Sequence, residues 1–333
     1  MGGRDPGRGL SAPPIPRQEF CCAAQDAVAS RGGSCDEAAM LADTLAASVI
    51  AELIAVIVAV TDGEPRVLTI DSGRELPSGP FESNHRSLQA SLRSWVERQT
   101  HHPLGYVEQL YTFADLDRAA PDRRVVSVSY LGLAQEARGS VGWRSWYDYF
   151  PWEDRRDTEI DRLSAPLLEW ADTASDAMLR WERRQRIAIG FGLDGNAWNE
   201  ELVLQRYETL WEAGLVPESG GTAASGQAMA HDHRRILATG IARLRGKIKY
   251  RPVVFELMPA SFTLGQLQQS VEALAGRRLH KQNFRRLIEQ QDLVEDTGRM
   301  ATETRGRPAR LVRFRRTVLA ERAVAGTKLP LAR

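Results

Sequence analysis

The longest apolar run of the sequence, Ala47 to Val60, is the feature that most limits the fold. It is about half as long as a membrane-spanning helix and contains Glu52. A run of this kind predicts the end of a helix followed by a buried strand. We therefore expect a chain without a transmembrane segment that buries this strand inside a globular domain.

The composition is typical of a folded protein with more than one domain. The chain has 333 residues, of which 43% are hydrophobic and 26% are charged. Residues 1–19 are rich in Gly, Pro and Arg and lack an apolar signal-peptide core, which predicts a disordered tail and a cytoplasmic location. Cys21, Cys22 and Cys35 have no zinc-ligand spacing, so we expect reduced thiols and no metal site.

Strand and helix patterns alternate over residues 50–135. Two short apolar runs flank the turn-rich segment Thr61–Pro65 and predict a β-hairpin. The predicted strands are Leu53–Val60, Arg66–Ile70, Tyr106–Phe113 and Val125–Leu133, and the predicted helix is Ser87–Thr100. Strands and a helix are therefore interleaved over this segment, and the fold class we expect is α+β.

The composition changes at Val141, where a Trp-rich segment begins and helical patterns follow. One helix places Val203, Tyr207, Leu210, Trp211 and Leu215 on a single apolar face, so we expect a packed helical insertion at 141–219. The segment Pro217–Ala230 is rich in Gly, Ser and Ala, which predicts a flexible linker or surface loop. We expect these parts to complete a domain over 20–230.

A connecting helix is predicted at 231–250. Asp232 is placed to cap it, and Leu237, Ile241, Leu244 and Ile248 share one face. Six Lys and Arg side chains, at 234, 235, 243, 245, 247 and 249, occupy its other positions. We expect this helix to join the two halves of the chain.

The segment 251–320 has the pattern of a winged helix-turn-helix, followed by a tail at 321–333. Pro252 suits the first turn of a short helix that Pro259 ends, and Thr263 begins a capping box with Gln266. Gly276 marks the turn before a recognition helix at 280–291, whose inner stripe is formed by Phe284, Leu287 and Ile288. Leu293–Glu295 and Leu311–Phe314 predict a two-stranded wing.

Positive charge gathers in this C-terminal segment. Residues 277–316 contain twelve Lys or Arg and five Asp or Glu, a local net charge of +7 that leaves −6 for the rest of the chain. A recognition helix reaches base edges and phosphates in the major groove, and arginines enter narrow minor grooves. The predicted DNA-binding residues are Thr263, Lys281, Gln282, Asn283, Arg285, Arg286, Arg305, Arg307 and Arg310. Double-stranded DNA is favoured over RNA because no aromatic stacking motif accompanies the charge.

Residues 79–100 resemble a Nudix box that has lost most of its acidic residues. The segment keeps the glycine, an Arg and one Glu of the box as Gly79, Arg93 and Glu97, with Trp95 at the apolar position. The other glutamate positions hold His85, Ser94 and Arg98, and Thr100 replaces the closing glycine. Nudix hydrolysis needs clustered carboxylates that hold magnesium ions, so we expect the fold without catalytic residues or a metal site.

The chain as a whole resembles the Nudix-related transcriptional regulators called NrtR over roughly residues 45–316. The resemblance is carried by the box, the strands after it, and the segments Asp232–His233, Leu244–Lys247, Phe262–Leu264, Asn283–Arg286 and Gly306–Arg310. The Trp-rich insertion and Tyr250–Pro259 are most similar to the alphaproteobacterial branch, NadQ. The resemblance implies a Nudix-like α/β/α sandwich with a helical insertion, followed by a C-terminal winged helix-turn-helix.

The same resemblance implies a homodimeric repressor of NAD-biosynthesis genes that is not an enzyme and requires no cofactor. Its Nudix-like domain would bind an effector nucleotide such as ATP, NAD or ADP-ribose. The sequence leaves open whether this effector releases or promotes DNA binding. Arginines suit phosphate capture, and the candidate nucleotide-binding residues are Arg93, Glu97, Arg118, Arg123 and Arg124.

Two other functions remain open from the sequence. The chain is an active Nudix hydrolase of ADP-ribose-type substrates if Glu75, Glu82 or Glu108 replace the lost metal ligands. It is a protein-interaction module if the insertion recruits another protein and the basic C-terminal segment is incidental.

Overall fold

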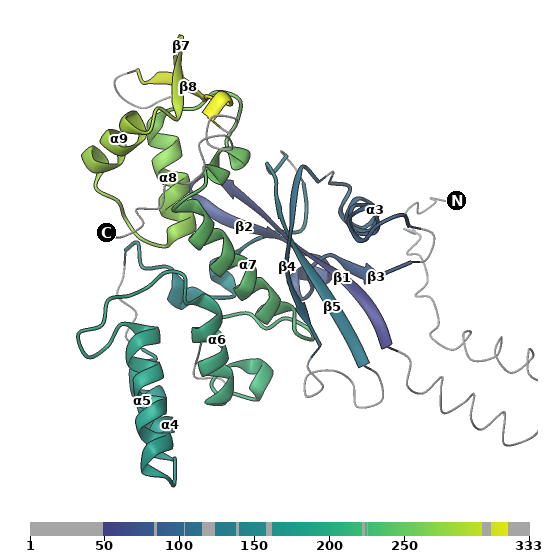
Figure 1. The fold of residues 1–333 in the computed structure, drawn as a ribbon, viewed down its shortest axis with the longest axis vertical. Coiled ribbons are helices and arrows are strands. Elements are labelled where there is room, and N and C mark those ends of the chain that lie inside the picture. The colour runs from purple at the N-terminus through teal and green to yellow at the C-terminus, as the bar shows by residue number, and fades with distance from the viewer. Residues whose placement is uncertain are drawn as a thin grey trace, which may run out of the picture. The chain divides into compact units, whose positions relative to one another are not determined.

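The computed structural model describes residues 49–82, 85–102, 104–114, 124–137, 140–157, 162–221, 224, 226–301 and 308–318 (Figure 1). The predicted tails at 1–19 and 321–333 and the three cysteines lie outside these ranges. Apart from Val49 and Arg124, the described residues belong to one compact unit.

A six-stranded sheet forms the first half of the described chain. Its order is β4-β5-β1-β2-β6, and β3 pairs with β1 outside this path. The strands are β1 (Val49–Thr61), β2 (Glu64–Leu68), β3 (Ser78–Pro80), β4 (Tyr106–Phe113), β5 (Arg124–Leu133) and β6 (Trp143–Ser145). β1 and β2 pair antiparallel, with Val58 opposite Val67, which confirms the predicted hairpin.

The central strand β1 is buried on both faces because its side chains alternate between two cores. Ile54, Val56 and Val58 enter one core, and Leu53, Ala55 and Ile57 enter the other. The helix α3 (Leu88–Thr100) supplies Leu92 and Val96 to the second core. The helix α7 (His233–Ile248) supplies Leu237, Ile241 and Leu244 to the first. Helices therefore cover both faces, and the predicted α/β/α sandwich is confirmed.

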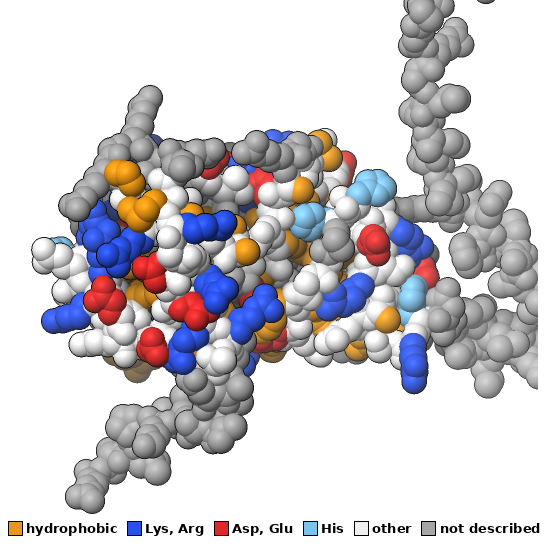
Figure 2. All heavy atoms as spheres, turned by 90° about the horizontal axis from the view of Figure 1, so that it is seen from above, with side chains coloured by type: hydrophobic (Ala, Val, Ile, Leu, Met, Phe, Trp, Pro, Cys, Tyr) orange, Lys and Arg blue, Asp and Glu red, His pale blue; other side chains and the backbone are white. Residues whose placement is uncertain are grey.

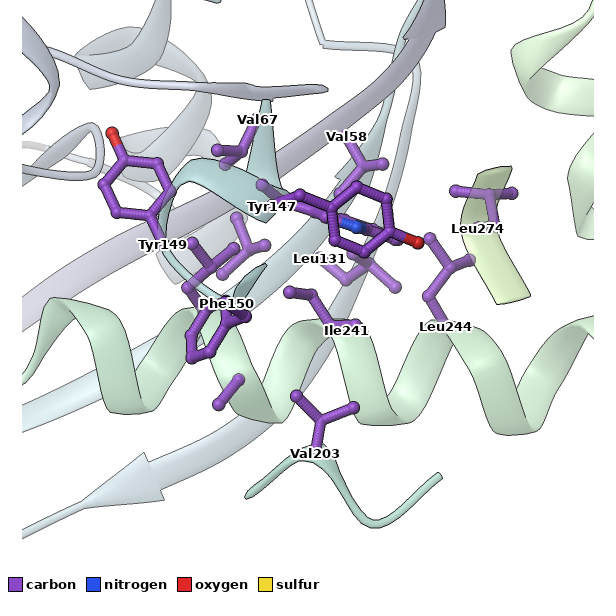
Figure 3. Packing of buried hydrophobic residues seen from close by; sticks show 14 of the residues in the cluster. Val58, Val67, Leu131, Tyr147, Tyr149, Phe150, Val203, Ile241, Leu244 and Leu274 are labelled. Atoms are coloured by element: carbon purple, nitrogen blue, oxygen red, sulfur yellow. The ribbon is translucent and has the colours of Figure 1, made fainter. Parts of the chain in front are cut away.

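α7 lies directly against β1. A Cβ atom added to Gly240 would lie 2.8 Å from Cγ1 of Val56, so only glycine permits this approach. Figure 3 shows side chains from the sheet, from α7 and from later elements meeting in this core, among them Val58, Ile241 and Leu274. The same core continues to Val318, so the sheet and the C-terminal elements share one apolar interior.

The insertion is a packed helical element, as predicted. It contains the short 3-10 turns η3 (Trp146–Asp148) and η4 (Pro151–Glu153), followed by α4 (Ser164–Asp172), α5 (Ala177–Phe191) and α6 (Val203–Glu212). Trp143, Trp146 and Trp152 are buried, so their rings serve packing and do not face solvent.

The prediction of a flexible linker at Pro217–Ala230 is wrong for the residues that the structure describes. A 3-10 turn, η5 (Pro217–Ser219), opens the segment, and Ala224 and Met229 are buried in the main core. Small residues are needed here because the chain passes close to itself: a Cβ on Gly221 would lie 2.0 Å from the carbonyl oxygen of Gly214. Composition alone cannot distinguish such packing from flexibility.

The C-terminal segment forms a winged helix. After the 3-10 turn η6 (Val253–Leu257) come α8 (Leu264–Ala275), α9 (Lys281–Gln290), β7 (Val294–Met300) and β8 (Arg310–Phe314). η6 replaces the short α-helix expected after Pro252. The capping box of Thr263 and Gln266 is present, which confirms that prediction. Within the described ranges, no helix is long and apolar enough to span a bilayer.

Candidate functional site

The outer face of α9 carries five polar side chains that are all exposed: Lys281, Gln282, Asn283, Arg285 and Arg286. None of them forms a hydrogen bond or ion pair with another described residue. Phe284 and Ile288 are buried and hold the opposite face of α9 against α8. Figure 2 shows Lys and Arg side chains gathered at the end of the molecule where α9 and the wing lie. The helix therefore presents cations and amides that are free to meet a ligand.

One residue of the predicted inner stripe of α9 is placed differently by the structure. Leu287 is 50% exposed, whereas Phe284 and Ile288 are buried. Phe284 and Ile288 are the two buried residues of this ten-residue helix.

The turn between α8 and α9 depends on Gly276. This residue has φ +70°, and a Cβ atom there would lie 2.2 Å from the carbonyl oxygen of Glu153. The buried carboxylate of Glu272 accepts a hydrogen bond of 2.9 Å from the backbone N–H of Leu279 and stabilises the chain after the turn. The direction in which α9 leaves α8 is thus fixed by backbone contacts.

The wing is formed by β7 and β8, which pair antiparallel with Val294 opposite Phe314. The side chain of Arg310 is 78% exposed and lies 3.5 Å from a carboxylate oxygen of Asp296. Arg305 and Arg307, at the predicted tip, lie outside the described residues. Of the three arginines predicted at the wing tip, Arg310 is therefore the one that lies within the described residues.

Thr263 lies apart from the exposed residues. Its side chain is buried, and its hydroxyl accepts a hydrogen bond of 3.1 Å from the backbone N–H of Gln266. The neighbouring Phe262 bridges to Val312 of the wing. The structure shows that Thr263 caps α8, and its contact with DNA stays a prediction.

The box helix α3 lacks a carboxylate cluster. Glu97 is exposed and contacts no described cation. Arg98 lies with its guanidinium carbon 4.1 Å from the centre of the Trp95 ring and 3.7 Å from a carboxylate oxygen of Glu82. His85 lies 3.5 Å from the same carboxylate group. On α3, the charged neighbour of Glu97 in the sequence is therefore Arg98, and the helix carries no second carboxylate.

Arg93, the retained arginine of the box, binds the backbone after α3. It donates one hydrogen bond of 2.9 Å to the carbonyl oxygen of Gly105 and another to that of Leu104. Of the other candidate nucleotide-binding residues, Arg118 and Arg123 lie outside the described residues, and Arg124 begins β5 without a described side chain. Of the five candidate residues, the structure therefore describes the side chains of Arg93 and Glu97 only, and the shared nucleotide site stays a prediction.

Gly79, the retained glycine of the box, lies beneath the ring of Trp95. A Cβ atom would lie 2.3 Å from Cδ2 of this ring, which itself is fixed by a 2.9 Å hydrogen bond to the carbonyl oxygen of Pro80. Gly79→Ala is expected to lower the free energy of unfolding by about 1–3 kcal/mol through overpacking. Urea unfolding measures this change.

Gly105→Ala is the matched control for Gly79→Ala because its nearest neighbour would lie 3.9 Å from the new Cβ atom, an ordinary contact. The control is expected to match the parent protein. Equal midpoints for the two variants would contradict the close contact between Gly79 and Trp95.

The alternative metal ligands are separated in the structure. Glu108 contacts Lys247 and the hydroxyl of Tyr106, so its charge is already compensated. Glu82 belongs to the group around Arg98, and Glu75 pairs through its backbone with Ile70. Across the described ranges, no three His, Cys, Asp or Glu side chains converge on a position that could hold a metal ion.

A buried ion cluster joins the insertion, α7 and the winged helix. The carboxylate of Glu153 lies 2.6 Å from Nε of Arg206 and also contacts Nη1 of Arg245, and all three side chains are completely buried. Nε of Arg245 donates a hydrogen bond of 2.8 Å to the carbonyl oxygen of Leu274, near the end of α8. Burial alone would raise the pKa of Glu153, but the two guanidinium groups hold this pKa below its usual value.

This cluster was missed by the sequence analysis, although a signal existed. Arg206 lies three residues after Val203 and four before Leu210, on the apolar face of α6, and Arg245 lies four after Ile241 on α7. An arginine in an apolar stripe indicates a buried partner, because an unpaired charge there is costly.

His233, at the start of α7, is a second buried group with a structural role. Its Nδ1 atom accepts a hydrogen bond of 2.9 Å from the backbone N–H of Leu76. Burial, with a smaller contribution from the nearby His231, lowers the pKa of His233 from 6.5 to about 4. The neutral imidazole therefore links α7 to the segment between β2 and β3.

The stability of the protein is expected to depend on pH through His233. Its folded pKa is depressed, so the unfolded chain binds more protons between pH 6.5 and pH 4. Stability is therefore complete above about pH 6.5 and falls by about 3 kcal/mol as the pH drops to 4. Urea unfolding across this range measures the slope.

His233→Gln is expected to flatten this pH dependence, because it removes the titrating group. His231→Asn is the control: it alters an exposed neighbour with positive φ, which Asn tolerates, and most of the slope is retained. A parent slope that persists in His233→Gln would show that another group causes it.

Comparison with known proteins identifies the C-terminal domain. Residues 254–314 match the family model described as the NrtR DNA-binding winged helix domain. The ADPR responsive transcriptional repressor NtrR of Acinetobacter baylyi is 38% identical over 86 residues, which are 26% of this chain and 34% of the relative. The chain thus aligns with about a third of that relative's length.

Solved structures resemble a larger share of the chain at lower identity. NrtR of Shewanella oneidensis, solved with a 27mer DNA, is 21% identical, and the match covers 81% of this chain and 95% of that one with a TM-score of 0.48. A MutT/nudix family protein from Enterococcus faecalis is 16% identical, and the match covers 88% and 98% with a TM-score of 0.47.

The described fold and the family match together define the two halves. A sheet between two helical layers, with a box helix next to β3, precedes a winged helix whose core continues that of the sheet. The chain therefore consists of a mixed α/β domain followed by a winged helix, and residues 254–314 match the family model of the NrtR DNA-binding winged helix domain.

Proposed function

We propose that this chain is a DNA-binding transcriptional repressor of the NrtR type. The observation that carries the proposal is the outer face of α9, where three cations and two amides are exposed and unpaired among the described residues. These residues lie in the first two turns of the second helix of a winged helix, the part of a recognition helix that enters the major groove. Their side chains match the donors and acceptors of base edges and phosphates.

Each segment of the chain has its own proposed role. Residues 20–230 form the Nudix-like sensor, 231–250 the connecting helix, and 251–320 the DNA-binding domain. In the wing, Arg310 is exposed, and Arg305 and Arg307 are proposed to join it at the minor groove. Two chains would form a homodimer that holds two recognition helices at the spacing of DNA half-sites.

The proposed effector is ADP-ribose, with ATP and NAD as the other nucleotides to compare. The support is the curated relative, which is described as ADPR responsive. NAD-biosynthesis genes as targets and membership of the NadQ branch are carried by the family resemblance, and action in the cytoplasm is carried by the composition of residues 1–19; all three belong to the proposal.

We further propose that the Nudix-like domain does not hydrolyse its ligand. Glu97 stands without a neighbouring carboxylate on α3, and the guanidinium of Arg98 lies where positive metal ions would have to bind. A metal-activated attack on a diphosphate needs carboxylates that hold the metal ion. The α3 helix can therefore support ligand binding without supporting the reaction.

ADP-ribose is expected to raise the melting temperature of the full chain and to change its affinity for DNA. At a concentration 100 times the Kd, a bound ligand stabilises by about 2.7 kcal/mol. A coupled effector changes DNA affinity about 5- to 150-fold. Thermal unfolding and DNA-binding anisotropy, each with ADP-ribose, ATP and NAD, measure the two effects.

The same samples distinguish the repressor from the hydrolase. Incubation with ADP-ribose and Mg²⁺ is expected to leave the ligand intact by chromatography. Turnover that disappears in Glu97→Gln would instead identify an enzyme. Absence of any effect of the three nucleotides on stability and DNA affinity would overturn the proposed effector.

A further inference from the structure

A cavity of about 260 Å³ lies inside the winged helix, between the end of α7, η6, α8 and α9. Its walls are largely apolar and include Val254, Phe255, Leu267, Phe284 and Ile288. Concave, mostly apolar cavities with a few polar groups are the usual form of small-molecule sites. This cavity is separate from α3 and from the outer face of α9.

Two exposed apolar side chains mark the cavity. Tyr250, after α7, is 57% exposed and Leu287, on α9, is 50% exposed, and both belong to the lining. Leu287 was predicted to be buried, and it is exposed because its side chain borders an open cavity. Large apolar side chains that border a cavity indicate a surface suited to an apolar ligand.

The charges around the cavity favour an anion. Lys249 and Arg277 lie 3.1 Å and 3.5 Å from Oε1 of Glu200, and Arg245 is bound to Glu153, so these cations are compensated. Arg251 also lines the cavity, is exposed, and has no ion pair with another residue in the described part of the chain. A positive charge without an ion pair among the described residues therefore lies beside an apolar interior, with Lys247 and Tyr106 also within its electrostatic reach.

We propose that this cavity binds a small aromatic monocarboxylate, with its ring among Val254, Phe255 and Phe284 and its carboxylate on Arg251. A guanidinium binds a carboxylate through two parallel hydrogen bonds, which orients the ligand as well as holding it. The volume lies below the roughly 300–1,000 Å³ of sites for drug-sized ligands, so it suits one or two rings and excludes long acyl chains.

The position of the cavity gives its ligand a route to α9. Phe284 and Ile288 line the cavity and are also the two buried residues that hold α9 in place. A ligand that contacts them is expected to change the affinity of α9 for DNA, and DNA is expected to change the affinity for the ligand equally. This consequence rests on the proposed DNA-binding function, whereas binding of the carboxylate does not.

The test measures binding of 2-naphthoate to the full chain in the absence of DNA, by ligand fluorescence or ligand-observed NMR. The uncharged 2-naphthamide has the same ring and is expected to bind at least about tenfold more weakly, because it lacks the charge-assisted bonds to Arg251. Arg251→Met is expected to reduce naphthoate affinity by the same factor and to leave naphthamide affinity unchanged.

Two further variants distinguish binding inside the cavity from general attraction of the ligand to surface charge. Ala275→Leu adds volume at a residue of the lining and is expected to abolish binding of both compounds. Arg299→Met, at an exposed arginine of β7 outside the lining, is the control and is expected to bind naphthoate normally. Thermal unfolding of each variant verifies that it is folded. If Ala275→Leu does not fold, Arg251→Met still decides the test.

Three results would overturn the proposal: no binding of 2-naphthoate to the parent protein, equal binding of naphthoate and naphthamide, or unchanged naphthoate affinity in Arg251→Met. Because DNA is absent from the assay, each of these results leaves the proposed DNA-binding function untouched. Failure of DNA binding with intact naphthoate binding would instead contradict the proposed DNA-binding function and leave the proposed cavity site untouched.

Discussion

Replacement of Glu153 by Gln is expected to lower the free energy of unfolding by about 3–5 kcal/mol. The variant keeps the size of the side chain but removes the negative charge between Arg206 and Arg245, both completely buried. Two uncompensated guanidinium groups would then remain in the interior, where a charge without a partner is costly. Urea unfolding at neutral pH measures the loss.

Asp172→Asn is the matched control for Glu153→Gln. It removes the same kind of charge from an ion pair, with Arg184 at 2.8 Å, but both side chains of that pair are about half exposed. Exposed pairs contribute about 0–1 kcal/mol, so this variant is expected to unfold almost like the parent protein. If Glu153→Gln also stays within about 1 kcal/mol of the parent, the buried cluster does not hold the domains together.

The double variant Arg285→Ala with Arg286→Ala is expected to bind a selected duplex at least about 30-fold more weakly than the parent chain. An arginine that contacts a base or phosphate contributes about 1–3 kcal/mol, and these two are exposed on the outer face of α9. Because neither side chain packs in the core, the variant is expected to keep its melting temperature. Fluorescence anisotropy with a labelled duplex measures the affinity.

Arg184→Ala with Arg186→Ala removes the same total charge from α5 and serves as the control for general electrostatics. Both arginines are about half exposed, and α5 lies in the insertion. All titrations must share one salt concentration, because DNA affinity falls steeply with ionic strength. Equal losses in the two double variants would show that net charge, and not α9, determines binding.

Much of the fold follows from local patterns in the sequence. The continuous apolar run of β1 predicts a buried strand, and because successive side chains of a strand point to opposite faces, such a run supplies both cores. The capping box at Thr263 predicts the start of α8 because its two hydrogen bonds involve only neighbouring residues. Such signals are readable because their partners lie close in the sequence.

Other features depend on partners far away in the sequence and could not be predicted. Arg245 on α7 binds Glu153, 92 residues earlier, and although its place in the helix indicates a buried partner, the sequence does not reveal which residue that partner is. Ala224 and Met229 are buried because distant segments cover them, although their neighbours are typical of a linker. Burial of this kind is decided by tertiary packing.

The candidate site was predicted in part, for the same reason. The polar face of α9 follows from helical periodicity, and the structure leaves its five side chains exposed. Thr263 and Arg93 were chosen by residue type, but the structure engages the first in a helix cap and the second with the carbonyl oxygen of Gly105. Hydrogen-bond partners, which the sequence does not reveal, determine which polar side chains remain available.

Selection of bound sequences from a pool of random duplexes by the full chain is the most direct test of the central claim. If α9 reads DNA, the parent chain enriches one sequence class, and the variant Arg285→Ala with Arg286→Ala fails to enrich it under the same salt conditions. Recovery of no sequence preference by the parent chain, with duplex affinity equal to that of the double variant, would contradict the assignment of α9 as a recognition helix.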